Sequence, residues 1–148
     1  MYKKIIVAVD DSETSRCALN EAVNIARISN ARLYIVHVAD EILLGMHHLE
    51  LSTTHNLDHA MSAMRSAGEK ILEDALAQAS GVEAETILLE TRKRRVSEVL
   101  VDKAHELGCD LIVIGRHGQR GLALLILGSV AEQVAKLSEA SVLLVRKH

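Results

Sequence analysis

Short apolar runs rich in β-branched residues alternate with helical patterns along this chain, and this alternation limits the fold more than any other feature. Such alternation is typical of strand–helix–strand units, which build a parallel sheet with helices on its faces. Strands buried on both faces are continuous apolar runs, as in Leu111–Ile114. The pattern predicts five strands, at about Lys3–Val9, Arg32–Val38, Glu83–Leu89, Leu111–Gly115 and Val142–Val145.

Four helices are predicted between these strands. The first follows Asp10-Asp11-Ser12 and runs to about Ser29; these residue types favour helix N-caps. We expect Asp11 or Ser12 to cap this helix and Asp10 to face the edge of the sheet. The other three helices are expected at about Leu57–Ser80, with Gly81 at its C′ position, at Val96–Leu107, closed by Gly108, and at about Ser129–Leu137.

Composition narrows the function classes. A chain of 148 residues predicts one domain, residues 1–148. Hydrophobic residues make up 49% but aromatic residues only 1%, so the core must be aliphatic. The net charge of −3 and the scarcity of aromatic side chains, with no Phe or Trp, argue against nucleic acid as a partner. We expect a cytoplasmic protein without a membrane span, with Cys17 and Cys109 as free thiols.

Glycines surround the end of the fourth predicted strand. Gly115 and Gly118 are followed, after nine residues, by Gly128-Ser129 at the start of the last helix. Glycine permits positive φ angles and close approach of a ligand, and the first N–H groups of a helix attract anions. Neither a Walker A lysine nor a dinucleotide fingerprint is present. A phosphate site and a purely structural turn therefore both remain open on these residues alone.

The stretch Gly115–Ser129 resembles the Gly-x2-Gly-x9-Gly-Ser/Thr motif of the universal stress protein (UspA-like) family, in its ATP-binding branch. The opening strand and acidic turn through Thr14, the run Ile35–Val38, the approach to the glycines and the closing strand are similar to that family too. The resemblance covers nearly the whole chain. It implies a three-layer α/β, flavodoxin- or Rossmann-like fold, with a five-stranded parallel sheet in the order 3-2-1-4-5.

The resemblance also implies an ATP site at the carboxyl edge of the sheet, where strands one and four diverge. Val38 would present backbone groups to adenine, and Ala8 to Asp10 would lie against adenine and ribose. Any Mg²⁺ would bind mainly through phosphate oxygens and water. The implied nucleotide-binding residues are Ala8, Val9, Asp10, Val38, Gly115, Arg116, His117, Gly118, Gly128, Ser129 and Val130.

These features favour an ATP-dependent regulator of the stress response that acts on an unidentified protein partner. The alternatives are a nucleotide-free interaction module of the same fold and a slow ATPase that uses His117. The last strand, Val142–Val145, is an expected edge strand and the expected homodimer contact. A response-regulator receiver is disfavoured because strand three ends Leu88-Leu89-Glu90-Thr91, without the phosphoacceptor aspartate.

Two charged or metal-binding patterns stay open. Arg92-Lys-Arg-Arg95 stands where relatives often carry glycine and acidic residues, and it is either a solvated face or a contact for an anionic partner. Five histidines fall within a short span, but zinc usually takes about four ligands that include cysteine or carboxylate, so exposed histidines are the favoured interpretation. They are His37, His47, His48, His55 and His59.

Overall fold

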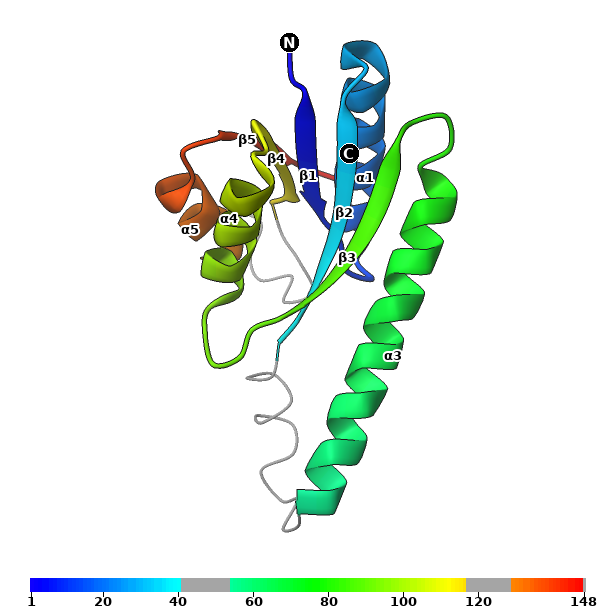
Figure 1. Cartoon of the computed structure of the whole chain (residues 1–148), viewed down its shortest axis with the longest axis vertical. Coiled ribbons are helices and arrows are strands. Elements are labelled where there is room, and N and C mark those ends of the chain that lie inside the picture. Colours follow the sequence, from blue (N-terminus) through cyan, green and yellow to red (C-terminus); the bar gives the residue numbers. More distant parts are fainter. Residues whose placement is uncertain (41–53, 117–128, 148) are drawn as a thin grey trace.

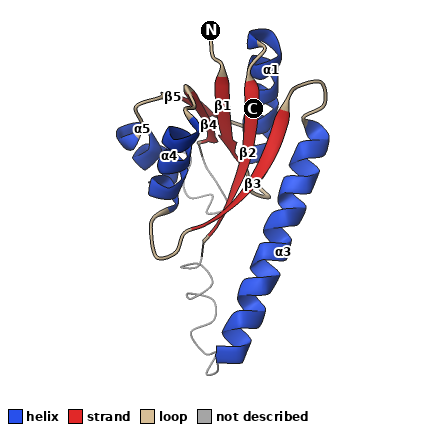
Figure 2. Cartoon of the chain, in the orientation of Figure 1, coloured by secondary structure: helices blue, strands red, loops and turns tan. Residues whose placement is uncertain are grey.

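A computed structural model of the chain describes residues 1–40, 54–116 and 129–147. Within these residues, five parallel strands form one sheet in the order β3-β2-β1-β4-β5, which confirms the expected order (Figures 1 and 2). Strand β1 therefore lies at the centre of the sheet, and β3 and β5 form its edges. The strands are β1 Lys4–Ala8, β2 Arg32–Ala39, β3 Ala84–Glu90, β4 Leu111–Gly115 and β5 Ser141–Val145.

Helices cover both faces of this sheet, as Figure 1 shows. One face is packed by α1 (Glu13–Ser29) and α3 (Thr54–Gln78), and the other by α4 (Val96–Leu107) and α5 (Ser129–Leu137). The fold is thus the expected three-layer α/β arrangement. No helix in the described ranges is long and apolar enough to cross a membrane.

Alternate side chains of the central strand supply both halves of an aliphatic core. Ile5 and Val7 point to the α1 and α3 side, whereas Ile6 points to the α4 and α5 side, and all three have no exposed surface. Burial of apolar surface contributes about 25 cal/mol per Å². A strand with two apolar faces can only be accommodated between two layers of helix, which is why the chain folds into three layers.

The amino edge of the sheet is held by one carboxylate. Asp110, which directly precedes β4, accepts hydrogen bonds from the backbone N–H groups of Lys3 (2.9 Å) and Lys4 (3.1 Å). The Asp110 N–H donates in turn to the Lys4 carbonyl (2.9 Å). These bonds tie the start of β1 to the start of β4 and so help to set the register between the two central strands.

Both ends of α3 differ from the sequence expectations, whereas the caps of α4 and α1 agree with them. Helix α3 begins at Thr54 and ends at Gln78, so Gly81 is not at the C′ position that we expected. Gly81 instead has φ of 82° in the turn before β3. Gly108 does close α4 as expected, in a left-handed conformation with φ of 70°. Ser12 is the N-cap of α1, where its side chain accepts a hydrogen bond from the Ser15 N–H.

The turn from β3 to α4 is strained. Arg92 and Lys93 have φ angles of 47° and 70°, in the left-handed region that favours glycine. Thr91, which is only 1% exposed, anchors the turn because its N–H donates to the Ala39 carbonyl (3.2 Å) and its carbonyl accepts from the Arg94 N–H (2.9 Å). A side chain in this conformation costs about 1–2 kcal/mol.

Relief of this strain is a measurable prediction. Lys93→Gly should raise the free energy of unfolding by about 1 kcal/mol, because glycine adopts the left-handed conformation without a Cβ clash. Lys93→Ala removes the same charge but keeps the Cβ, so it should give no such gain. Urea denaturation of the two variants measures the difference, and equal stabilities would show that the backbone is not strained at this position.

Candidate functional site

The two central strands separate at the carboxyl edge of the sheet. Strands β1 and β4 pair as far as Val7 and Val113. Beyond that point the Val9 N–H donates to the Val36 carbonyl of β2 (2.8 Å), and the Arg116 N–H donates to the Val145 carbonyl of β5 (2.8 Å). The chain after β1 enters α1 on one face, and α5 lies on the opposite face. Such a divergence creates the crevice where open α/β sheets bind ligands.

The turn after β1 is held by a short hydrogen-bonded network. The Asp10 N–H donates to Ser15 Oγ (2.8 Å), and Asp10 Oδ1 accepts from the Ser12 N–H (2.8 Å). The Ser15 N–H donates to Ser12 Oγ (3.1 Å). Asp10 is half-buried and stands at the end of β1, as expected, while Ser12 caps the helix. This network orients the acidic turn before any ligand arrives.

His37 of β2 supports the same turn from the side. Its Nδ1 lies 2.8 Å from the carbonyl oxygen of Val9, and because a carbonyl can only accept, Nδ1 carries the proton. Helix α3 passes so close that a Cβ on Gly68 would lie 2.9 Å from His37 Cδ2. The sequence marked His37 only as a member of a histidine group, since its bond to Val9 spans 28 positions and has no local pattern.

Gly115 allows close packing and is not there for a left-handed backbone turn. Positive φ among the described glycines occurs at Gly81 and Gly108, so Gly115 is not needed here for a left-handed turn. A Cβ at this position would lie 2.9 Å from Thr14 Cγ2 of α1. The missing side chain therefore lets the first turn of α1 pack directly on the end of β4.

The expected nucleotide-binding residues lie partly within the described ranges. Ala8 ends β1 and is followed by Val9 and Asp10, and Gly115 ends β4 and is followed by Arg116, so these two groups lie at the same edge of the sheet, where β1 and β4 diverge. Val38 lies near the end of β2, half-buried, and pairs with Leu89. Ser129 is the exposed first residue of α5, and Val130 is half-buried against the core. The remaining three, His117, Gly118 and Gly128, lie outside the described residues.

A cavity of about 350 Å³ adjoins the crevice between α1 and α3. Val9, Asp10 and Ser15 form its end at the acidic turn, and Leu19, Ile71 and Ala75 form its apolar wall. None of its lining residues comes from the end of β4. We therefore place the candidate site at the divergence of β1 and β4, with this cavity as a neighbour on the α1 and α3 side.

Neither metal nor redox chemistry gains support from the described residues. They contain no group of three or more histidine, cysteine or acidic side chains placed to hold a metal ion. His47, His48 and His55 lie outside the residues whose side chains are described. Burial raises the pKa of the Cys109 thiol to about 11, so this thiol stays protonated at neutral pH and is a poor nucleophile.

The end of β3 does not resemble a phosphoacceptor site. Glu90 occupies the position and forms an ion pair with Arg65 of α3. The hydrogen bond from Arg65 lowers the pKa of Glu90, and the nearby charge of Arg92 adds a smaller effect in the same direction. A carboxylate that is already paired in this way serves packing between α3 and β3.

The contact at Gly115 yields a test of the crevice geometry. Gly115→Ala should lower the free energy of unfolding by about 1–3 kcal/mol, because the new methyl group overlaps Thr14 Cγ2. Thr14→Ser removes only that Cγ2 methyl, so the double variant should recover most of the loss. A double-mutant cycle by urea denaturation measures the coupling. Additive losses would contradict the proposed contact.

Comparison with known proteins agrees with this architecture. A model of the universal stress protein family matches residues 1–146. Universal stress protein YxiE of Bacillus subtilis is 36% identical over 151 residues, which cover 99% of this chain and 100% of the relative.

Solved structures extend the likeness to three dimensions. A universal stress protein in complex with cAMP is 30% identical, with a TM-score of 0.69 and 97% of each chain covered. The universal stress protein of Archaeoglobus fulgidus in complex with dAMP is 26% identical, with a TM-score of 0.65 and coverage of 97% of this chain and 98% of that one. Because the family match, the sequence identity and the fold agree over almost the whole length, this chain belongs to the universal stress protein family.

Proposed function

We propose that the protein binds ATP at the divergence of β1 and β4 and acts as a nucleotide-dependent regulator in the cellular stress response. The observation that carries this proposal is the separation of the two central strands, where Val9 bonds to β2 and Arg116 bonds to β5. The family relatives solved with cAMP and dAMP support an adenine nucleotide as the ligand class.

Backbone groups would do most of the binding. Residues Ala8 to Asp10 and Val38 would contact adenine and ribose, because they lie at or next to the carboxyl ends of β1 and β2, at the edge of the crevice. The N-terminus of α5 at Ser129 would face the phosphates, where free N–H groups and the helix dipole favour anions. Mg²⁺ would be held by phosphate oxygens and water, with few ligands from the protein.

A switch suits this site better than an efficient phosphoryl-transfer enzyme. Such transfer needs a positioned base or water and a charge clamp on the γ-phosphate. Asp10 is an acidic group at the end of β1 in this crevice, and its carboxylate already accepts the Ser12 N–H. We therefore propose that nucleotide occupancy, with slow turnover at most, changes the surface presented to a protein partner.

Bound nucleotide can be measured directly. The freshly purified protein is denatured and removed, and the supernatant is analysed by anion-exchange chromatography; we expect a stoichiometric ATP peak. Gly118→Leu should weaken ATP binding at least about a hundredfold in calorimetry, because a large side chain at a glycine that the resemblance assigns to phosphate binding would exclude the phosphates. An empty wild-type protein that also fails to bind added ATP would replace this proposal with the nucleotide-free interaction module.

Gly81→Ala is the matched control for the glycine variant. It places a Cβ on a glycine with φ of 82°, in the turn between α3 and β3 at the amino edge of the sheet. We expect it to lower stability and to leave ATP affinity unchanged. Equal losses of affinity in the two variants would indicate general destabilisation and not a blocked site.

We further propose that β5 pairs with β5 of a second copy to form a homodimer. The Val145 carbonyl faces β4, so alternation along a parallel ladder makes Leu143 face β4 and turns the N–H groups of Val142 and Leu144 to the open edge. An edge strand with unpaired backbone groups favours such pairing.

The direction of these N–H groups decides which variant tests the dimer. Leu144→Pro removes an outward N–H and should give a monomer in size-exclusion chromatography with analytical ultracentrifugation. Leu144→Thr keeps the N–H and should remain dimeric. A Leu144→Pro protein that stays folded and dimeric would rule out pairing through β5.

A further inference from the structure

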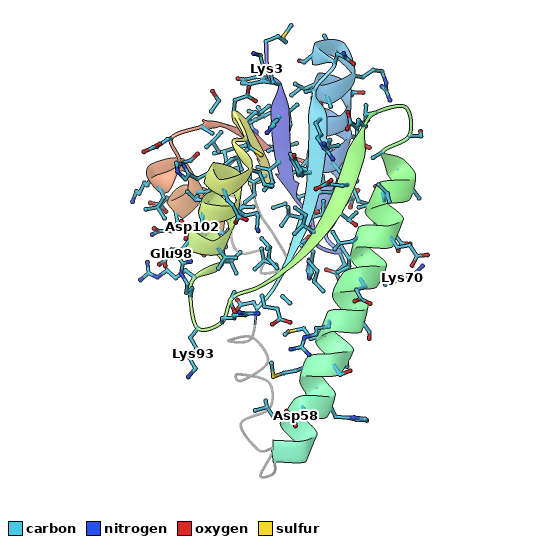
Figure 3. The ribbon with its side chains drawn as sticks, in the orientation of Figure 1. Lys3, Asp58, Lys70, Lys93, Glu98 and Asp102 are labelled. Carbon is cyan, nitrogen blue, oxygen red and sulfur yellow. The ribbon has the colours of Figure 1, made fainter. Side chains whose placement is uncertain are left out.

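Four consecutive cations join β3 to α4. Arg92, Lys93, Arg94 and Arg95, here termed the basic loop, are all exposed, although the chain has a net charge of −3. Figure 3 shows Lys93 at the outside of this turn, pointing away from the body of the molecule. The basic loop therefore forms a concentrated positive surface on a protein that is otherwise acidic.

Most of this positive charge is not neutralised within the described part of the fold. Arg94 pairs with Asp102 (2.7 Å) and Glu98 (3.6 Å) of α4. Among the described residues, no carboxylate oxygen lies within 4.0 Å of a side-chain nitrogen of Arg92, Lys93 or Arg95. Glu90, two residues before Arg92, is paired with Arg65, and the charge of Arg92 has only a smaller effect on this carboxylate.

The fold keeps these side chains where simpler residues would suit the backbone better. Arg92 and Lys93 adopt left-handed conformations that favour glycine. Arg95 is the N-cap of α4, where it makes no side-chain hydrogen bond and places a cation at the positive end of the helix dipole. These residues oppose the local backbone and helix-cap preferences, and no contact among the described residues compensates for it. Positions of this kind often serve function.

The basic loop lies away from the end of β4, where the phosphates are proposed to bind. It begins at edge strand β3, two strands from β1 and three from β4 in the sheet. With strands about 4.8 Å apart, its root lies roughly 14 Å from the line of β4. Thr91 nevertheless bonds to Ala39, the residue after Val38, so the loop borders the edge at which the nucleotide is proposed to bind.

We propose that the basic loop is a docking surface for an acidic segment of a partner protein. Carboxylate side chains complement the three cations that form no ion pair among the described residues, and guanidinium groups bind carboxylates in a bidentate manner. A nucleic acid fits less well, because the chain has a net charge of −3 and an aromatic content of 1%. This surface does not depend on nucleotide binding, so its test can be read even if the protein binds no ATP.

The test uses a fluorescein-labelled oligoglutamate peptide as the probe, with oligoglutamine of equal length as the uncharged reference. Fluorescence anisotropy at low ionic strength should show binding of oligoglutamate alone. The triple variant Arg92→Gln, Lys93→Gln and Arg95→Gln should lower its affinity by about tenfold or more and flatten its salt dependence. Circular dichroism confirms that the variant is folded.

A charge-matched variant separates docking from a general effect of net charge. Lys70→Gln, Lys136→Gln and Arg146→Gln also removes three exposed cations, so both triple variants change the formal net charge from −3 to −6. We expect this control to bind oligoglutamate like the wild type. Similar losses in both triple variants would overturn the proposal, as would a wild-type protein that does not bind the peptide.

A second variant keeps the proposal testable if the triple variant misfolds. Arg92→Gly with Lys93→Gly removes two of the cations while relieving the left-handed backbone. It should be more stable than the wild type and yet bind oligoglutamate more weakly. Unchanged peptide affinity in this stable variant would show that the basic loop is only a solvated turn.

Two competition experiments identify the kind of anion. Saturating ATP should leave oligoglutamate bound, because the peptide binds to the basic loop and not at the proposed nucleotide site. Complete displacement by ATP would assign the basic loop to the nucleotide site instead. Tighter binding of a labelled single-stranded RNA than of oligoglutamate would likewise overturn the choice of a protein partner.

Discussion

The parallel pairing of β1 with β4 at the centre of the sheet is the constraint on which the rest of the structure depends. Ile6 and Val7 are buried on opposite faces of β1, so helices must cover both sides. Asp110 holds the two strands in register at the amino edge. Their pairing ends at Val7 and Val113, and each strand then continues beside its outer neighbour. The crevice is thus a consequence of how the core is packed.

Close packing and hydrogen bonds fix the described part of this crevice. Gly115 allows α1 to lie against the end of β4, and Gly68 allows α3 to lie against His37. His37 in turn donates to the Val9 carbonyl, beside the hydrogen-bonded turn at Asp10. Groups held in this way lose little conformational entropy when a ligand binds, which is consistent with the proposed backbone recognition of a nucleotide.

The basic loop, unlike the core, contains residues that do not match the local backbone preferences. Core positions agree with local propensity and burial, and Gly108 at the end of α4 adopts the conformation that glycine favours. At Arg92, Lys93 and Arg95, local propensity and the helix dipole oppose the residues that are present. Within the described residues, Glu98 and Asp102 of α4 form ion pairs with Arg94, and Arg92, Lys93 and Arg95 form none. The proposed docking of an acidic segment would account for this conflict.

The sequence by itself determined the elements whose signals are local, and the tertiary structure decided the contacts between distant residues. The apolar run of β4 and the Gly108 stop of α4 gave correct bounds, and the resemblance gave the strand order. The reach of α3, the packing of Thr14 on Gly115 and the bond from His37 to Val9 had no sequence pattern. Helix caps and apolar periodicity act over a few residues, whereas these contacts exist only after the parallel crossovers have brought separate segments to one edge of the sheet.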